Sequence, residues 1–518
     1  MKRFDRRSFL RYSGVAAASM AWADGAPLAT TAAGKISGVV EDGVNVFKGI
    51  PYGGDTTKTR FKAPAPPKPW KDVMACTRFA AMAPQLAARG AQSEDCLHLN
   101  VWTAGLRDNQ KRPVLVYFHG GAYNNGTVNS DLYDGRRLVH RGDVVVVTVN
   151  HRLNAFGYLY LGDLAPEYAQ SGNAGQLDLV LALEWVRANI AEFGGDPSRV
   201  LIFGQSGGGA KCAALMATPA AKGLFHRVMT MSGQQIKGAS IEIASGRTRT
   251  VLGKMGVAPG KDLAARLNAL AMEQIQDGAR AVSADWLPVV DNVTLSRNPF
   301  DPDAPALSEM VPMILGNTHD ETAVPSREAL TWEMAPAALK SAVSEYLGPY
   351  TAEEVVAKYR EIYPNYTPEQ VATAAATAFR AWPGQRWEAE RRAANPKSQP
   401  RSWVYQMNFQ GAGGKAMHTI DIPFMFDNIA MAEGQIGSAP EQLAAANALA
   451  ATMSEMLIAY ARSGNPNCAG LPNWPAYDLK NRGTMMWERT PRIENDPRGA
   501  ERVFADKSHY HQAGTPLP

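Results

Sequence analysis

Five short apolar runs recur along the chain, and each of them ends at a glycine, an asparagine or a serine. They show little polar alternation, which is typical of parallel strands that are covered on both faces. Residues 176–193 carry apolar side chains at helical spacing, as a crossover helix between such strands does. The runs are RPVLVYFHG (112–120), VVVVTVN (144–150), RVLIFGQS (199–206), HRVMTMSG (226–233) and VPMILGN (311–317).

This alternation predicts a doubly wound α/β fold with a mostly parallel central sheet and helices on both faces. SWVYQMNFQ (402–410) is a plausible last strand. From about 325 to 400 the pattern becomes helical and rich in aromatic residues, so we expect a helical cap insertion there. We expect residues 24–518 to form a single domain. Ligands of such sheets bind at the carboxyl ends of the strands, so the residues after each run are the candidates for chemistry.

The formal net charge of +4 lies entirely in the first 23 residues. That segment holds five of the 53 basic residues and one of the 49 acidic residues, which leaves 48 of each in the remainder. Because basic and acidic residues are equal in number after residue 23, the charge gives no reason to expect nucleic acid or an anionic membrane as a partner.

Residues 1–23 have a charged start, a short weakly apolar stretch and the sequence Ala-Trp-Ala, which suits signal cleavage. Arg6-Arg7 followed by Ser-Phe-Leu resembles a bacterial twin-arginine export signal. We therefore expect export, to the periplasm; the alternative is a frayed basic N-terminus in a cytosolic protein. The apolar stretch is too short to span a bilayer, and no run of about 20 apolar residues occurs elsewhere, so we expect no stable membrane insertion.

The sequence Gly204-Gln205-Ser206-Gly207-Gly208 fits G-x-S-x-G, the turn between a strand and a helix that presents a nucleophilic serine. The preceding run supplies the strand, and residues 208–217 supply the helix, whose N-terminus would stabilise an oxyanion beside Ser206. The alternative is a glycine-rich turn with a passive serine.

A second glycine-rich stretch, His119-Gly120-Gly121-Ala122-Tyr123, follows the strand at 112–120. Its small residues would let backbone N–H groups reach a ligand oxygen, as in the second half of an oxyanion hole. A plain tight turn is the alternative here.

A serine nucleophile requires a base, and the base requires an acid that holds its tautomer. In this fold the order along the chain is serine, acid, histidine. Among nine histidines, His418 follows the last predicted strand, and Asp320 and Glu321 follow the strand at 311–317. From position alone either carboxylate could be the acid. His319 is a competing base, but neighbours in an extended loop tend to point apart.

Four cysteines are too few for a disulfide scaffold and lack the spacing of a zinc site. In an oxidising compartment, Cys76 and Cys96 could close a loop of about 20 residues. Cys212 lies in an alanine-rich helical stretch and is expected to be a small buried filler.

With these residues in place, the chain resembles the type-B carboxylesterases, the cholinesterase-like family of the α/β-hydrolase fold, over nearly its whole mature length. The resemblance rests on many ordered matches beyond the nucleophile motif. They are GIPYG (49–53), RFKAPAPPKPW (60–70), SEDCLHLNVW (93–102), FGGDP (193–197), PVVD (288–291), GNTHDE (316–321), HTIDIPFMF (418–426) and NPNCAGLPNWPAYD (465–478).

The resemblance implies a catalytic triad of Ser206, Glu321 and His418. It also implies an oxyanion hole and a disulfide bond. The oxyanion hole would be the backbone N–H groups of Gly121, Ala122 and Gly207, and the disulfide would join Cys76 to Cys96. No metal or organic cofactor is called for, and the sequence sets no oligomeric state.

The chain departs from the family at three positions near these motifs. Gln205 and Gly207 replace the usual Glu and Ala beside the serine, and His98 stands where Tyr is usual. Glycine keeps the N–H group at 207 but adds backbone freedom, which would make the oxyanion hole less rigid. None of the three removes a catalytic atom.

The resemblance thus implies a serine hydrolase that acts on small carboxylic esters through an acyl-enzyme on Ser206, and the N-terminal signal adds that it is exported. The same triad could hydrolyse a carbamate or an amide, or transfer the acyl group to an alcohol, because pocket shape and water access choose the leaving group and the acceptor. A non-catalytic binding protein of the same fold is a third reading, although this chain keeps all three triad residues.

Overall fold

A computed structural model describes residues 25–515 apart from four short gaps. The predicted export signal at 1–23 lies outside the described residues, and so does the beginning of the predicted cap. The gaps are 87–88, 283–285, 325–328 and 509.

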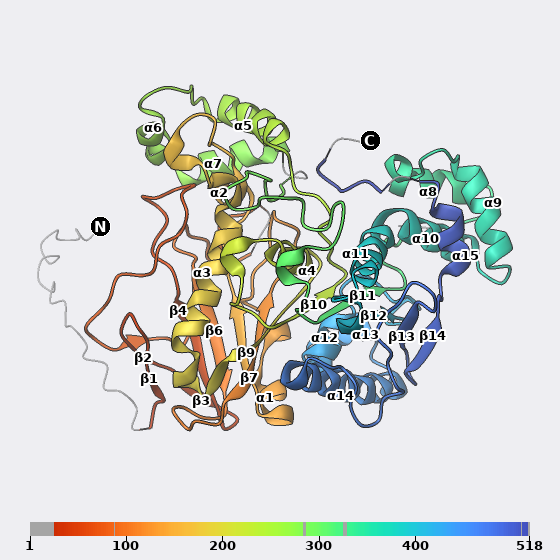
Figure 1. The fold of residues 1–518 in the computed structure, drawn as a ribbon, viewed down its shortest axis with the longest axis horizontal. Helices are drawn as coiled ribbons and strands as arrows, with labels where there is room; N and C mark the ends of the chain where they lie inside the picture. Colours follow the sequence, from red (N-terminus) through yellow and green to blue (C-terminus); the bar gives the residue numbers. More distant parts are fainter. Residues whose placement is uncertain (1–24, 87–88, 283–285, 325–328, 509, 516–518) are drawn as a thin grey trace, which may run out of the picture.

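An eleven-stranded sheet runs through the middle of the molecule (Figure 1). Its strands, in chain order, are β3 (Val39–Glu41), β4 (Val44–Pro51), β6 (His98–Thr103), β7 (Arg112–Phe118), β8 (Val145–Val149), β9 (Gly195–Gln205), β10 (Arg227–Met231), β11 (Met313–Thr318), β12 (Ser402–Met407), β13 (Gly483–Trp487) and β14 (Arg492–Asn495). Their order in space is β14-β13-β12-β11-β10-β9-β7-β8-β6-β4-β3. The strands from β8 to β13 are parallel, and both edges of the sheet are antiparallel. The six predicted strands are β7 to β12, so the predicted mostly parallel sheet is confirmed.

Helices cover both faces of the sheet, and strand β7 shows how the sequence achieves this. Val114, Val116 and Phe118 enter one core, which they share with helices α3 and α4, whereas Leu115 and Tyr117 enter the opposite core with α1, α12 and α14. Successive side chains of a strand point to opposite faces, so an unbroken apolar run is what a strand buried on both sides requires. The helices are α1 (Arg136–Gly142), α3 (Ala174–Asn189), α4 (Gly207–Met216), α12 (Asp421–Met425) and α14 (Pro440–Ser463).

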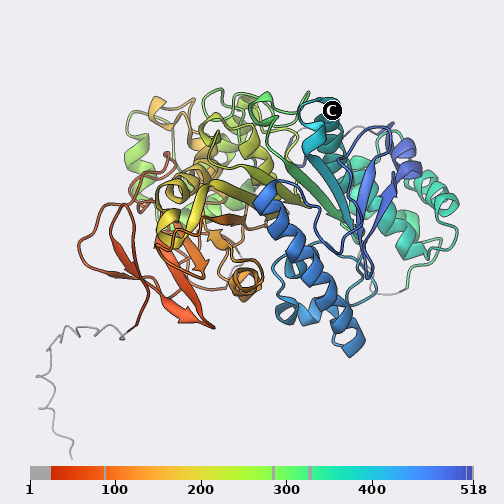
Figure 2. The same cartoon turned by 60° about the horizontal axis from the view of Figure 1, so that its bottom comes forward.

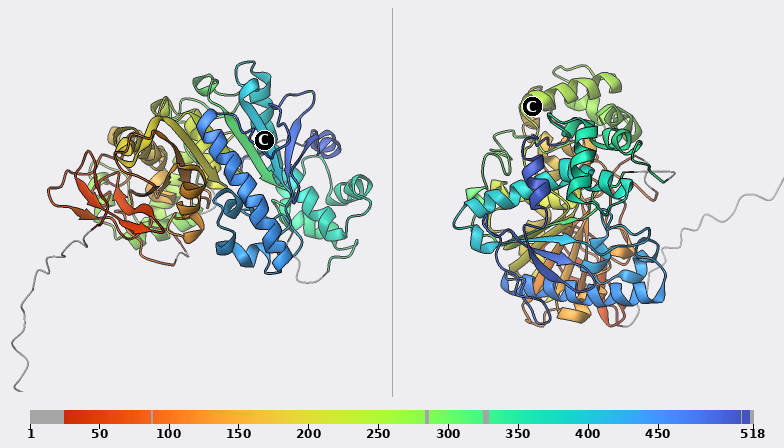
Figure 3. Two further views of the ribbon diagram at one scale, coloured as in Figure 1. Left: turned by 90° about the horizontal axis from the view of Figure 1, so that it is seen from below. Right: turned by 90° about the vertical axis from the view of Figure 1, so that its right-hand side faces the viewer.

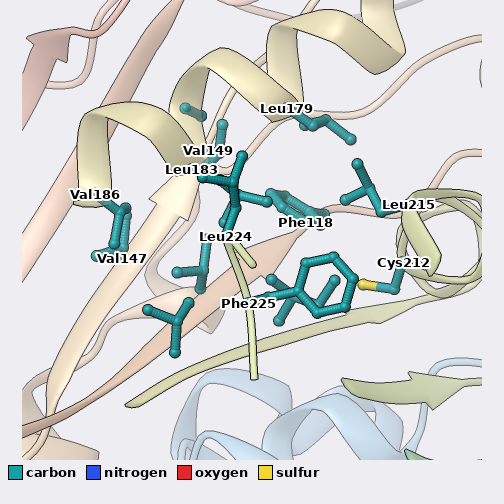
Figure 4. Close-up of a cluster of buried hydrophobic side chains, with 14 of the residues drawn as sticks. Phe118, Val147, Val149, Leu179, Leu183, Val186, Cys212, Leu215, Leu224 and Phe225 are labelled. Atoms are coloured by element: carbon teal, nitrogen blue, oxygen red, sulfur yellow. The ribbon is translucent and has the colours of Figure 1, made fainter. Parts of the chain in front are cut away.

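The first core lies between α3, α4 and the strands β7 and β8 (Figure 4). The crossover helix predicted over 176–193 corresponds to α3 and a short 3-10 turn that ends at Phe193. Cys212 points from α4 into this core beside Phe225, and it is fully buried as a free thiol. It therefore packs as the small apolar residue that the sequence predicts.

Helix α14 crosses the other face of the sheet (Figures 2 and 3). Among the described residues, it is the one helix that is long and apolar enough to cross a membrane by length and composition, and half of its apolar window is buried. Leu449, Met453 and Leu457 are buried in the second core. This burial is what the core helix of a globular protein shows.

Two groups of helices lie outside these layers (Figures 1 and 3). The first group, which the sequence analysis did not predict, packs with the short helix α2 and buries Trp286 and Leu287 in a core of its own. The second group combines three helices of the predicted cap segment with α15, which follows β14 in the chain, and these helices pack together near the β14 edge. The groups consist of α2 (Asn154–Tyr158), α5 (Ile241–Met255), α6 (Leu263–Ala269) and α7 (Met272–Ala279), and of α8 (Ala335–Val343), α9 (Ala352–Ile362), α10 (Pro368–Ala376) and α15 (Gly499–Ala505). Helix α11 (Trp382–Ala394), also from the predicted cap segment, packs against β11 and β12 and joins the first core through Ala389.

The remaining short elements lie at the periphery. A three-stranded sheet, in the order β1-β2-β5, stands apart from the large one, and helix α13 precedes α14. They are β1 (Leu28–Thr30), β2 (Lys35–Ser37), β5 (Met74–Ala75) and α13 (Glu433–Ile436).

The structure does not form the expected disulfide between Cys76 and Cys96, because both residues are buried free thiols. The Cys76 sulfur lies 4.0 Å from the carbonyl oxygen of Gly49, whereas Cys96 lies farther along β4, where Tyr52 donates to the carbonyl of Leu97. Three residues of strand correspond to about 10 Å. A disulfide needs Cα atoms within about 7 Å, and the contacts of the two cysteines lie at different positions along β4. Burial raises the pKa of Cys76 to about 12, which leaves its thiol protonated.

Candidate active site

Ser206 occupies a sharp turn between β9 and α4. Its backbone has φ 55° and ψ −125°, a conformation that L-residues rarely adopt. The neighbouring glycines make the turn possible: a Cβ at Gly204 would overlap the backbone of Gly208, and a Cβ at Gly208 would overlap the carbonyl oxygen of Phe118. The predicted turn between a strand and a helix is therefore present at Ser206, with its helix beginning at Gly207.

The loop after β7 lies against this turn. A Cβ on Gly120 would lie 3.3 Å from the Cβ of Ser206, and a Cβ on Gly207 would overlap the backbone of Ala122. Gly121 and Ala122 both have positive φ angles, of 86° and 50°, which turn the chain tightly. The two glycine-rich stretches that the sequence singled out are thus in contact.

His418 and Glu321 also meet, although they are far apart in the sequence. His418 lies in the loop between β12 and α12, and its Nδ1 is 2.5 Å from the Oε2 of Glu321. The Glu321 side chain is only 2% exposed, and its Oε1 accepts hydrogen bonds from the N–H of Thr318 at 2.6 Å and the amide of Asn317 at 3.3 Å. Glu321 is therefore held from one side while it faces the imidazole from the other.

The electrostatics of this pair favour its charged form. Burial alone raises the pKa of Glu321, but the charge and hydrogen bond of His418 outweigh it and lower that pKa below the ordinary value. Burial lowers the pKa of His418, but the carboxylate of Glu321, helped by Asp421, outweighs it and raises that pKa. The carboxylate is thus ionised at neutral pH and stabilises an imidazolium beside it.

The alternative acid and base contact each other instead. Asp320 Oδ1 lies 2.8 Å from His319 Nδ1, and its Oδ2 accepts a hydrogen bond of 2.8 Å from the N–H of Ala416. This places Asp320 and His319 together and leaves Glu321 as the carboxylate that contacts His418. Position along the chain had left both carboxylates open, whereas the family resemblance had implied Glu321.

The remaining imidazole nitrogen, Nε2 of His418, faces the side-chain amide of Gln205, 3.2 Å from its nitrogen. No hydrogen bond joins Ser206 to His418 among the described residues. Gln205 immediately precedes Ser206, so the imidazole lies at the serine turn without reaching the hydroxyl. Catalytic hydrogen bonds are often long in ligand-free enzymes and tighten when substrate binds.

Two buried charged residues near the site received no role from the sequence. Asp421 is fully buried, accepts a hydrogen bond of 2.8 Å from the Tyr405 hydroxyl, and has its pKa raised to about 6 by burial. Lys211, in α4, is also fully buried. The only sequence signal was the charge itself, which in a helix ordinarily marks an exposed face.

A cavity of about 200 Å³ opens beside the loop after β7. Amide side chains supply most of its polar lining, so a substrate group in it would meet both hydrogen-bond donors and acceptors. The lining residues are Gln85, Leu86, Asn124, Asn125, Asn154, Gln276, Ala279 and Trp286. Within the part of the chain that the structure describes, no group of three or more His, Cys, Asp or Glu side chains could hold a metal ion.

Comparison with known proteins identifies the family to which the chain belongs. A family model described as the carboxylesterase family matches residues 25–505. The chain belongs to the carboxylesterase family. The esterase is 33% identical over 503 residues to the para-nitrobenzyl esterase of Bacillus subtilis (strain 168), a match that covers 92% of this chain and 97% of that protein.

Solved structures agree with the family. The carboxylesterase of Geobacillus stearothermophilus at pH 6.2 superposes with a TM-score of 0.80 at 35% identity, covering 92% of this esterase and 99% of that chain. An esterase from anaerobic Clostridium hathewayi, described as able to hydrolyse aliphatic aromatic polyesters, superposes with a TM-score of 0.79 at 30% identity, covering 94% and 99%. The fold is therefore that of the α/β-hydrolases, and the protein is a carboxylic-ester hydrolase with small-molecule esters as its substrates.

Proposed function

We propose that this esterase works through an acyl-enzyme on Ser206, with His418 as its base and Glu321 as the acid of the triad. The observation that carries the proposal is the 2.5 Å contact between His418 and the buried Glu321, beside a serine held in a strained turn. Glu321 fixes the proton on Nδ1 of His418, so Nε2 is free to accept a proton. A modest rotation of the imidazole from Gln205 towards Ser206 completes the relay.

The chemistry then proceeds in two halves. The Ser206 oxygen attacks the ester carbonyl carbon while its proton passes to His418, and the carbonyl oxygen becomes an oxyanion. The backbone N–H groups of Gly121, Ala122 and Gly207 donate to that oxyanion. His418 returns the proton to the leaving alcohol, and a water molecule then repeats the same steps on the acyl-enzyme, which releases the carboxylic acid and restores the serine.

Covalent labelling tests this assignment. We expect a fluorophosphonate probe to modify Ser206 alone and to stop hydrolysis of p-nitrophenyl butyrate with one equivalent bound, because the probe reacts with a serine only where base and oxyanion hole are assembled. Peptide mapping by mass spectrometry reports the labelled residue. A label on any other residue, or full activity after labelling of Ser206, would remove the assignment.

We propose further that residues 1–23 direct export, since Arg6-Arg7 and Ala-Trp-Ala have the arrangement of a twin-arginine signal. Edman sequencing of the protein recovered from the periplasm of its host should begin at Asp24. An uncleaved protein found only in the cytosol contradicts this proposal.

A further inference from the structure

The ammonium group of Lys211 is buried without a counter-ion. The side chain is fully buried in α4, and the contacts of its Nζ with the described residues include no carboxylate. Burial is costly for a charge, and it lowers the pKa of Lys211 to about 7. The groups that Lys211 contacts should therefore explain why a cationic side chain is buried here.

Among the described residues, the hydrogen-bond and ring partners of the Lys211 ammonium all belong to one loop, residues 119–123. Nζ donates to the carbonyl oxygen of Ala122 at 2.7 Å and to that of His119 at 3.2 Å, and it lies 5.5 Å from the ring centroid of Tyr123. Two carbonyls and a π face are what an ammonium prefers after a carboxylate. Lys211 therefore ties both ends of residues 119–123 to α4.

The peptides between these two anchors have their own partners. The Nδ1 of His119 lies 2.8 Å from the carbonyl of Gly120, and the carbonyl of Gly121 accepts from the N–H groups of Asn124 and Asn125 at 3.1 Å each. Burial, followed by the charge of Lys211, lowers the pKa of His119 to about 3, so its imidazole is neutral. In a trans peptide the N–H points opposite to the C=O. The N–H of Gly121 therefore points away from the His119 imidazole, and the N–H of Ala122 points away from the N–H groups of Asn124 and Asn125.

Gly207 leaves the room that this arrangement requires. A Cβ at 207 would overlap the backbone of Ala122, so the loop can come down onto the start of α4 only where residue 207 is glycine. Lys211 lies four positions later on the same helix, about one turn away, and pulls on the same residue, Ala122. Glycine at 207, where the family usually has alanine, adds backbone freedom. The contacts of Lys211 with the loop restrict that freedom.

We infer that Lys211 is a positioning residue of this esterase: its ammonium clamps residues 119–123 against Gly207 and so aims the N–H groups of Gly121 and Ala122 at the oxyanion. The inference rests on the proposed function of those N–H groups. Lys211 itself touches carbonyl oxygens of the loop and takes no part in proton transfer. Its effect is on kcat, because the oxyanion forms only after the substrate has bound.

Lys211→Met tests the clamp, since methionine fills a similar volume but donates no hydrogen bond. We expect kcat for p-nitrophenyl butyrate to fall by about 10- to 100-fold with KM changed by less than about threefold, by comparison with the loss of an oxyanion donor. The Tm should change little, because the loss of two hydrogen bonds from Nζ is offset by the removal of a buried charge. Cys212→Ala is the matched control on the same helix: its side chain points into the core, so it should leave kcat unchanged.

Chemical rescue separates positioning from packing. In Lys211→Ala, millimolar propylammonium should restore part of kcat in a saturable manner, whereas propanol should not. Unchanged kcat in Lys211→Met overturns the inference, and so does a loss that follows a lowered Tm without rescue by the amine. Failure of both variants to fold overturns it as well. A fluorophosphonate label at a residue other than Ser206 would instead refute the proposed site, whereas labelled Ser206 with an active Lys211→Met refutes the clamp alone.

Discussion

Replacing Ser206 by alanine is expected to reduce hydrolysis of p-nitrophenyl butyrate by at least about 10⁴-fold. The hydroxyl oxygen forms the covalent bond to the acyl group, and no neighbouring side chain of the serine turn can take its place. Binding and the oxyanion hole should survive, so KM should change little while kcat collapses. Initial rates at saturating substrate measure the effect.

The loss of activity identifies Ser206 as the nucleophile only if the Ser206→Ala variant is correctly folded. Alanine keeps the strained backbone that Ser206 adopts and adds no atom, so the Tm of Ser206→Ala should match that of the parent protein. Ser198→Ala is a suitable control, because Ser198 lies at the start of the same strand, bonded to Asp196, and should leave kcat unchanged. Substantial turnover by Ser206→Ala with no other serine labelled would rule out the acyl-enzyme on this residue.

The sequence predicts the strands well because their chemistry is local. Val145 to Val149 and Val114 to Phe118 are buried on both sides, so an apolar run was enough to place them. Helices α5 to α7 were missed because Gly, Thr and Arg interrupt the apolar spacing of α5, and their burial depends on Trp286 and Leu287 from another segment. Packing between segments that are distant in the sequence produces no hydrophobic periodicity from which a helix could be predicted.

The site shows the same division. The turn at Ser206 could be predicted from its glycines, because only residues without a Cβ fit there. This is a local requirement, so it is visible in the sequence. The choice between Asp320 and Glu321 depended on which side chain faces the loop from β12, and this follows from the bridge between Asp320 and Met417. Lys211 was read as part of an alanine-rich helix, because a sequence does not show that a cation is buried. The disulfide between Cys76 and Cys96, which the family resemblance implied, is not formed in the structure, and their spacing along the chain gives no distance in space.

Replacing Glu321 by glutamine is expected to lower kcat by about 10³- to 10⁴-fold, as removal of the charge of a triad acid does. The surroundings of Glu321 explain why an amide is a poor substitute. Thr318 N–H donates to Oε1 at 2.6 Å, so the oxygen of glutamine should occupy that side and its NH₂ group should face Nδ1 of His418. An NH₂ donor there favours the tautomer with its proton on Nε2, which cannot accept the proton of Ser206.

The pH dependence of the residual activity supplies an independent check on the same variant. Glu321 raises the pKa of His418, and a base is active only when it is unprotonated, so the acid limb of kcat/KM reports that pKa. Without the carboxylate the imidazolium loses stabilisation, its pKa falls, and the acid limb should move to lower pH. Asp320→Asn should leave both kcat and the limb in place, because Asp320 faces His319 and Ala416 instead. If Asp320→Asn moved the limb and Glu321→Gln did not, the acid of the triad would be Asp320.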